Sequence, residues 1–167
     1  VLGSLLAKYR NEKVSLPGGC AIGSRPINLH LEALKKMGAK LKIKNGYIVA
    51  SVKKNLIGTT IRFPKISVGA TENILIASCF AQGKTKLRNC AIEPEVRDLV
   101  IFLKKIGCKI KWVRERGIDV TGVKKFKSAS HKIIFDRIEA GTYIIASAIT
   151  KGILKIKNIE PKYIRTE

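Results

Sequence analysis

The sequence predicts an α/β fold built from a unit that is repeated about twice. Segment 26–50 resembles segment 94–122, because each opens with a proline and carries an apolar stripe at helical spacing. In each segment the helix is predicted to end at a glycine, Gly38 or Gly107, and two short alternating strands follow. These two glycines lie 69 residues apart.

A second pair of segments repeats with the same spacing. Segment 67–89 parallels segment 136–158: each contains a helix rich in Ile and Ala, a glycine stop and a short strand ending at an asparagine. The stops, Gly83 and Gly152, also lie 69 residues apart, so one register relates both pairs. The order of helix, two strands, helix and strand predicts a tandem α/β module rather than a Rossmann domain.

The apolar stripes of these helices are predicted to form the core. They recur at positions i, i+3 and i+4, which places them on one helical face. The stripes are Leu29, Leu31, Leu34 and Met37 in one helix and Leu99, Phe102, Leu103 and Ile106 in the other.

The composition limits the class of protein. The chain has 167 residues, enough for one sizeable domain, and none of its apolar runs approaches the ~20 residues of a membrane span. The first residues lack the pattern of a secretory signal peptide.

The excess of positive charge, 33 Lys and Arg against 12 Asp and Glu, suggests nucleic acid as a partner. The lysines are nevertheless dispersed and aromatics for base stacking are few, which makes nucleic acid unlikely and favours small anionic substrates.

The cysteines indicate reduced thiols in a cytosolic protein. Positions 20, 79, 90 and 108 form no C-x-x-C pair and no metal-like cluster with either histidine, so no metal site is expected. Cys20 differs from the others, because it lies in LPGGCAIGSRP (16–26) directly after two glycines. This pattern is typical of a reactive-cysteine loop with Arg25 beside the thiol, although a simple turn has the same composition.

The motifs together resemble the UDP-N-acetylglucosamine 1-carboxyvinyltransferases, which are enolpyruvyl transferases. The resemblance rests on PGGCAIGSRPINLH, FPKISVGATENILIASCFAQGKT, NCAIEPEVRDLVIFLKKIGCKI and FDRIEAGTYIIASAITKG, and it spans nearly the whole chain. It implies the inverted α/β barrel-type enolpyruvyl transferase fold, with two domains of three βαβαββ units each. About two units fall in this chain, with residues 1–134 in the first domain and 135–167 at the start of the crossing to the second.

The resemblance implies a reaction and a role for the loop. The family moves the enolpyruvyl group of phosphoenolpyruvate to the 3-hydroxyl of UDP-N-acetylglucosamine and releases phosphate, the first committed step of peptidoglycan synthesis. Cys20 matches the lid cysteine that acts as acid, forms an adduct with phosphoenolpyruvate and is alkylated by fosfomycin. Arg25 matches the loop arginine that meets phosphate charge, which suits a guanidinium.

The resemblance also implies a set of binding residues for UDP-N-acetylglucosamine. The set is Arg25, Pro26, Ile27, Asn28, Leu29, His30, Lys65, Ser67, Val68, Gly69 and Glu93. Asn28 stands where the family commonly has Asp. Glu93 before a proline is also an ordinary helix start. Asp136 and Arg137 match a segment close to the cleft, but Asp136 equally suits a helix N-cap.

The resemblance leaves several family residues without a counterpart, so we expect a partial chain with little or no activity alone. The missing residues are a Lys-Asn pair that contacts phosphoenolpyruvate, a catalytic aspartate and phosphate-clamping arginines. No cofactor and no membrane partner is expected, and the expected location is the bacterial cytoplasm. The alternative is a basic anion- or nucleic-acid-binding module that keeps the fold without catalysis.

Overall fold

The computed structural model describes residues 1–18, 27–114 and 116–164. The chain divides into two compact units, Val1–Ala129 and Ser130–Glu167. The expected domain boundary at residue 134 stays a prediction.

The first unit contains the predicted helix, two strands, helix and strand between residues 28 and 88, with an additional short strand before the second helix. Its elements are α1 (Leu2–Tyr9), β1 (Asn11–Ser15), α2 (Asn28–Lys36), β2 (Lys40–Lys44), β3 (Tyr47–Ser51), β4 (Thr60–Arg62), α3 (Val68–Phe80), β5 (Lys84–Arg88), α4 (Pro94–Lys105), β6 (Lys109–Val113) and β7 (Gly117–Thr121). The second unit contains α5 (Arg137–Thr150) and the short 3-10 helix η1 (Pro161–Tyr163).

The strands form two sheets with the same internal topology. The first sheet has the order β1-β3-β2 and the second the order β4-β5-β7-β6. In both, the last strand of the unit lies in the middle and pairs antiparallel with its two neighbours, while β4 adds a parallel strand to β5. The run from β4 to β7 is therefore one complete βαβαββ unit, and the run from α1 to β3 repeats all of it except the first strand. The predicted likeness of 26–50 and 94–122 is confirmed, whereas the likeness of 67–89 and 136–158 holds only for the helix.

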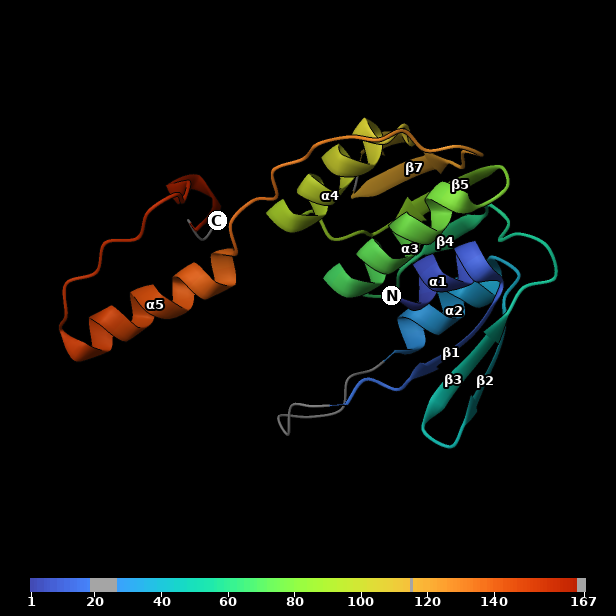
Figure 1. The fold of residues 1–167 in the computed structure, drawn as a ribbon, viewed down its shortest axis with the longest axis horizontal. Helices are drawn as coiled ribbons and strands as arrows, with labels where there is room; N and C mark the ends of the chain where they lie inside the picture. The colour runs from blue at the N-terminus through green and yellow to red at the C-terminus, as the bar shows by residue number, and fades with distance from the viewer. Residues whose placement is uncertain (19–26, 115, 165–167) are drawn as a thin grey trace. The chain divides into compact units, whose positions relative to one another are not determined.

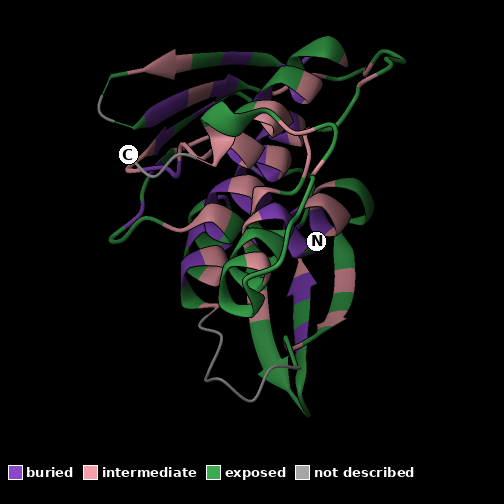
Figure 2. Ribbon diagram, turned by 90° about the vertical axis from the view of Figure 1, so that its left-hand side faces the viewer, coloured by how far each residue is buried: buried purple, intermediate pink, exposed green. Residues whose placement is uncertain are grey.

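The core of the first unit lies where the helices meet the sheets. Figure 1 shows α1, α2 and α3 between the two sheets, and Figure 2 shows the buried residues gathered there. The α3 helix is buried around most of its circumference, since eight of its 13 residues are buried. Its Ile74, Leu75 and Ala77 are fully buried. Of the predicted core residues, Met37 is fully buried and Phe102 is partly buried against the core.

Two of the four predicted glycine stops end helices in the expected way. Gly38 and Gly107 have φ of 93° and 102°, the left-handed region that glycine enters without steric cost. The other two differ from the prediction. The α3 helix ends at Phe80, and Gly83, with φ of 89°, lies instead in the turn before β5. The α5 helix ends at Thr150 and is followed by a left-handed Lys151, one residue before Gly152.

The second unit lacks the strand predicted before Asn158. Asn89, which follows β5, and Asn158 share a left-handed φ, 58° and 61°. The left-handed backbone conformation thus recurs at both equivalent positions of the repeat. Yet 153–157 pairs with no strand among the described residues, whereas β5 pairs with both β4 and β7. A strand needs partners for its N–H and C=O groups, so the same local sequence pattern leaves this segment extended and unpaired.

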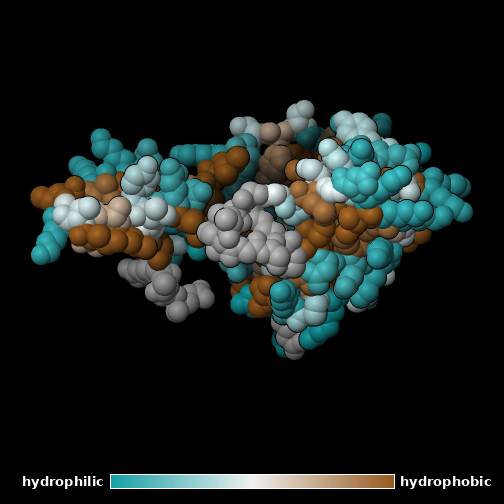
Figure 3. All heavy atoms as spheres, turned by 90° about the horizontal axis from the view of Figure 1, so that it is seen from below, coloured by the Kyte–Doolittle hydropathy of each residue, from teal (hydrophilic) through white to brown (hydrophobic). Residues whose placement is uncertain are grey.

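The α5 helix exposes apolar side chains that its counterpart α3 buries. Only Ala140 of α5 is buried. Figure 3 shows apolar side chains on the surface of this unit. They include Ile138, Tyr143, Ile145 and Ile149. No helix among the described residues is both long and apolar enough to cross a membrane.

Candidate functional site

Part of the predicted site lies outside the described residues. Cys20, Arg25 and Pro26 fall in the segment 19–26, so their catalytic and binding roles stay predictions. The other predicted residues can be located, and most of them lie at the starts of helices.

The first group lies at the start of α2. Ile27 is the residue before the helix, Asn28 is its exposed first residue and His30 is half-buried in the first turn. Leu29 is only 5% exposed and belongs to the hydrophobic core. The Leu29 side chain therefore packs in the core. Only the Leu29 backbone is left to contact a ligand at the start of the helix.

The start of α2 lies against the start of α3. The imidazole of His30 faces Gly69, because a Cβ placed on Gly69 would lie 3.7 Å from His30 Cε1. Burial, followed by the positive α-amino group of Val1, lowers the pKa of His30 below its ordinary value. The ring is thus neutral at pH 7, with one nitrogen able to donate and the other to accept a hydrogen bond. Two segments that the sequence separates by some 40 residues meet at this pair.

The start of α3 is closed by Ser67. Its hydroxyl accepts a hydrogen bond from the Ala70 N–H at 3.2 Å, the usual role of an N-cap serine. Val68 is the first helical residue and Gly69, the second, is exposed. Lys65 is exposed shortly before the helix, so its ammonium is free to reach solvent or an anion. The first turn of a helix beside a lysine is a favourable place for a phosphate.

Thr71 joins this helix to the next loop, a role that sequence reasoning missed. Its hydroxyl donates to the Ser67 carbonyl at 2.7 Å and accepts from the Ala91 N–H at 3.0 Å. Both Thr71 and Ala91 are fully buried. A threonine in a first helical turn is too common to predict a bond to a residue 20 positions away, so only the fold reveals it.

Glu93 is the N-cap residue of α4. Its carbonyl accepts a hydrogen bond from the Val96 N–H at 3.0 Å, and its carboxylate accepts one from the Ile92 N–H at 2.7 Å. Proline follows at the first helical position, as that position favours. The structure thus gives Glu93 the helix-start role that the sequence left open beside ligand binding.

The starts of α3 and α4 bring two carboxylates near each other. Burial, and then the negative charge of Glu95, raise the pKa of Glu72 above its ordinary value. Figure 1 shows that α3 and α4 both begin at the left-hand end of the first unit. Helix N-termini carry partial positive charge. The segments 27–30, 65–71 and 91–93 form the candidate site. Its helix starts and the exposed Lys65 favour an anionic ligand, whereas the Glu72 and Glu95 carboxylates oppose one.

Asp136 and Arg137 lie in the second unit. The Asp136 carboxylate accepts from the Ile138 and Glu139 N–H groups at 2.8 and 3.0 Å, so it is the N-cap of α5. Arg137 is the first residue of the helix. Capping accounts for Asp136 by itself, and a role for either residue at a ligand stays a prediction.

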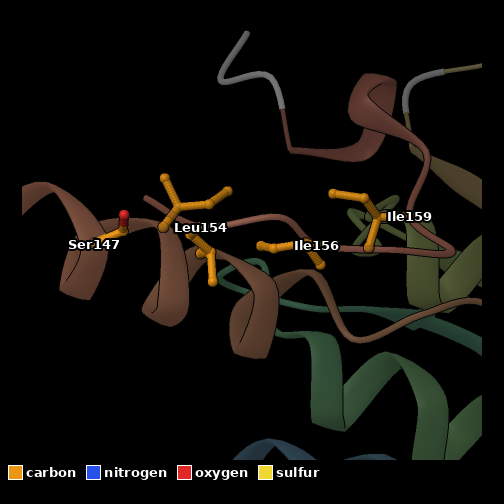
Figure 4. A pocket seen from close by; sticks show the side chains of 5 residues that line it. Ser147, Leu154, Ile156 and Ile159 are labelled. Carbon is orange, nitrogen blue, oxygen red and sulfur yellow. The ribbon is translucent and has the colours of Figure 1, made fainter. Parts of the chain in front are cut away.

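The second unit also contains a small apolar pocket, shown in Figure 4. It is lined by Ile144, Ser147, Leu154, Ile156 and Ile159. Its only polar side chain, Ser147, already donates to the Gly152 carbonyl at 2.8 Å. The pocket thus offers no titratable group for catalysis.

The described part of the chain offers no metal centre and three buried cysteines. It holds no group of three His, Cys, Asp or Glu residues that could bind a metal ion. Cys79, Cys90 and Cys108 are buried free thiols. Burial raises the pKa of Cys90 to about 12. The hydrogen bond between Cys79 and Cys108 raises the pKa of Cys79, to which burial adds, and lowers the pKa of Cys108.

Comparison with known sequences gives consistent matches. The sequence model of the EPSP synthase family (3-phosphoshikimate 1-carboxyvinyltransferase) matches residues 1–167. The UDP-N-acetylglucosamine 1-carboxyvinyltransferase of Pelagibacter ubique is 59% identical over 167 residues, 100% of this chain and 40% of that protein. The enzyme of the same name from Endomicrobium trichonymphae is 48% identical over 99% of this chain and 40% of that protein. The chain thus spans about 40% of the length of these relatives.

Comparison with solved structures supports the fold. The enolpyruvyl transferase NikO from Streptomyces tendae superimposes with a TM-score of 0.71 at 19% identity, over 87% of this chain and 35% of that one. EPSP synthase from Acinetobacter baumannii gives a TM-score of 0.67 at 20% identity, over 89% and 33%. The predicted enolpyruvyl transferase fold is therefore confirmed.

Proposed function

The chain belongs to the EPSP synthase family of carboxyvinyltransferases, and from that premise we propose a specific reaction for the whole protein. It transfers the enolpyruvyl group of phosphoenolpyruvate to the 3-hydroxyl of UDP-N-acetylglucosamine and releases phosphate. The observation that carries the proposal is the 59% identity, over every residue of this chain, to a relative named for that activity. The reaction is then the first committed step of peptidoglycan synthesis, in the bacterial cytoplasm.

The site at the helix starts supports the binding half of this proposal. A nucleoside diphosphate sugar is an anion, and the first turns of α2 and α3 present N–H groups with the exposed Lys65 nearby. His30 and Gly69 lie together, so one ligand can touch both segments. A neutral His30 contributes hydrogen bonds rather than charge, while Lys65 supplies the positive charge. The proposed ligand set is Arg25, Pro26, Ile27, Asn28, Leu29, His30, Lys65, Ser67, Val68, Gly69 and Glu93, with Asp136 and Arg137 as further candidates.

The chemical half of the proposal rests on Cys20 and Arg25. The enol phosphate of phosphoenolpyruvate becomes a good electrophile at C2 only when its methylene carbon is protonated, and a thiol held over it can deliver that proton. A guanidinium beside the phosphate forms paired hydrogen bonds and stabilises the charge that develops as phosphate leaves. Neither step calls for a metal or an organic cofactor.

The 167 residues alone are proposed to turn over slowly or not at all. They span about 40% of the length of their relatives, and the family resemblance implies that residues of the remainder complete the site. In this proposal residues 1–134 belong to the first domain and 135–167 begin the crossing to the second. The remainder of the enzyme is then the partner that completes the site.

Fosfomycin labelling followed by intact-mass analysis tests the proposal. The chain is incubated with fosfomycin, with and without UDP-N-acetylglucosamine, and the modified residue is mapped. We expect one adduct, on Cys20, that forms faster with the sugar nucleotide, and none on a Cys20→Ser variant. No adduct, or equal slow labelling of all four cysteines, would contradict the proposal and favour the alternative, a basic anion-binding module without catalysis.

A further inference from the structure

The outer face of the four-stranded sheet is strongly basic. Because side chains alternate between the faces of a strand, residues such as Ile61, Leu87 and Val120 point to the core and are buried. Their neighbours point away from it. The basic residues on this outer face are Arg62, Lys84, Lys86, Arg88, Lys109 and Lys111.

Strand pairing brings these cations together from distant parts of the sequence. Lys86 and Lys111 both lie opposite Asp119, on the strands to either side of it. Lys84 and Lys109 flank Thr121 in the same way. Neighbouring strands lie about 4.8 Å apart, so each of these lysine pairs spans about 10 Å. The lysines that look dispersed along the chain thus form a cluster on one surface.

Asp119 is the one acidic side chain that the described strands place on this face. It forms ion pairs with Lys84 at 2.9 Å and with Arg88 at 2.8 Å. Burial alone would raise the pKa of Asp119, but these two cations hold it below its ordinary value. Arg62, Lys86, Lys109 and Lys111 form none of the ion pairs described for this unit, and all four are exposed. Four positive charges therefore remain uncompensated on one face.

We propose that this outer face, which we call the basic sheet face, binds the phosphodiester backbone of a nucleic acid duplex without regard to base sequence. A duplex has the highest charge density among nucleic acids, and its phosphates alone supply non-specific affinity. No aromatic side chain points outward from these described strands to stack on a base. An anionic membrane fits less well, because stable membrane attachment needs an apolar or acyl anchor besides basic charge, and the described strands offer none on this face.

The proposal departs from the sequence-based expectation, which made nucleic acid unlikely because no basic segment stands out. The reason is the two-residue period of a strand: it separates lysines in the sequence by one core residue each and gathers them on the same surface. The face lies on the sheet rather than at the helix starts. Its test is therefore independent of the transferase proposal.

The uncompensated charge sets the expected salt dependence. With about four phosphates neutralised, log of the binding constant should fall with log of salt concentration at a slope of about −3.6. Non-specific affinities of this kind lie at about 10⁻⁴ to 10⁻⁶ M near physiological salt. Fluorescence anisotropy of a labelled duplex, titrated with the whole chain at several KCl concentrations, measures both quantities.

A charge-matched pair of triple variants locates the surface. Lys86→Gln, Lys109→Gln and Lys111→Gln together remove three charges from the basic sheet face, and the slope should flatten by about 2.7. Lys35→Gln, Lys36→Gln and Lys104→Gln remove three exposed charges from α2 and α4, and the slope should change by less than about 1. Equal changes in the two triple variants would overturn the proposal, since net charge alone would then explain binding.

A single substitution is also expected to tighten binding. Misfolding cannot explain such a gain, because a misfolded chain would bind less tightly. Asp119→Asn releases Lys84 and Arg88 from their ion pairs, so the slope should steepen toward about −5.4 as the charge available rises from about four to about six. Glu32→Gln makes the same change in net charge on the exposed side of α2 and should have a smaller effect. Equal tightening by the two variants would contradict the proposal.

Two further outcomes would also overturn it. The three-stranded sheet carries Lys40, Lys42 and Lys44 on its outer side. If their triple Gln variant flattens the slope more than the variant of the basic sheet face, the site lies on the other sheet. If vesicles of pure phosphatidylserine bind the chain more tightly than the duplex does at the same salt, the partner is a membrane.

Discussion

The hydroxyl of Thr71 accepts a hydrogen bond from the backbone N–H of Ala91 at 3.0 Å, while both residues are fully buried. This bond connects the start of α3, which carries Ser67 and Gly69, to the loop that leads into α4 and Glu93. The same hydroxyl donates to the Ser67 carbonyl, so one side chain holds two parts of the candidate site together. In the proposed site, Thr71 would therefore be a positioning residue.

Replacing Thr71 by Val should destabilise the chain. The shape is retained, but the buried Ala91 N–H loses its acceptor, which costs about 1 to 3 kcal/mol of the free energy of unfolding. Urea denaturation followed by circular dichroism measures this loss. The control is Thr121→Val, an exposed position on β7, where a change below about 0.5 kcal/mol is expected. A Thr71→Val variant as stable as the control would show that the bond contributes nothing.

Replacing Gly3 by Ala should also destabilise the chain, although alanine favours helices. A Cβ on Gly3 would lie 2.6 Å from the Asn73 carbonyl oxygen and 2.9 Å from Asn73 Oδ1, which accepts the Gly3 N–H. The expected loss of about 1 to 3 kcal/mol from overpacking exceeds the gain of about 1 kcal/mol in helix propensity. Thermal melts measure the difference. Gly69→Ala is the control, because its Cβ would make only an ordinary contact, and a matching loss there would contradict the steric argument.

The stability contribution of Glu72 should depend on pH. Burial and Glu95 raise its pKa in the folded chain. Between the unfolded and the raised folded pKa the native state binds more protons, so the free energy of unfolding falls as pH rises through that window. Glu72→Gln is therefore expected to be more stable than the parent near pH 7, with the difference vanishing below about pH 4. Urea unfolding across that pH range measures it.

The control for this pH dependence is Glu32→Gln, which removes a carboxyl from the exposed side of α2. The same pH profile in both variants would show that the effect reflects net charge. The burial of Glu72 and the charge of Glu95 would then make no contribution to the pH dependence.

The buried cysteines should react with thiol reagents only after unfolding. With its pKa raised to about 12, Cys90 has about a thousandfold less thiolate near pH 8 than a thiol at the reference value of 9.0. Iodoacetamide labelling followed by peptide mass mapping, in buffer and in urea, checks this for Cys79, Cys90 and Cys108. Rapid labelling of Cys90 in buffer would contradict its burial, and it would also remove the selectivity on which the fosfomycin test depends.

Asp136 should act through its N-cap bonds. Asp136→Ala removes the acceptor of two N–H groups and should weaken α5 by about 1 kcal/mol, while Asp136→Asn keeps an acceptor and should restore most of it. Hydrogen exchange of the first amides of α5 measures the local effect. Equal exchange in Asp136→Ala and the parent would rule out a capping role.

Much of the fold follows from local pattern. The proline starts, the apolar stripes and the positive-φ glycines at Gly38 and Gly107 are properties of short segments, and the structure has helices ending just before both glycines. The same local argument was wrong for 153–157. Its alternation matches that of β5, but a strand exists only where another strand supplies hydrogen bonds.

The candidate site could be predicted only as separate segments. The sequence indicated 27–30, 65–69 and Glu93 through a family resemblance, and the structure brings His30 to Gly69. It could not indicate Thr71, because its partner Ala91 comes from another element. The contribution of Cys20 and Arg25 lies outside the described residues and awaits the labelling experiment.

By itself, the sequence determined the repeat, the order of helices and strands, and the family, since each depends on residues close together in the chain or on motifs that survive as short runs. Only the tertiary structure decided which distant residues meet. It paired Thr71 with Ala91, placed His30 against Gly69 and gathered the lysines of β5 and β6 around Asp119. The physical reason is that hydrogen bonds, ion pairs and clustered charge act over a few ångströms in space, and the folding of the chain, rather than distance along it, sets which groups come that close.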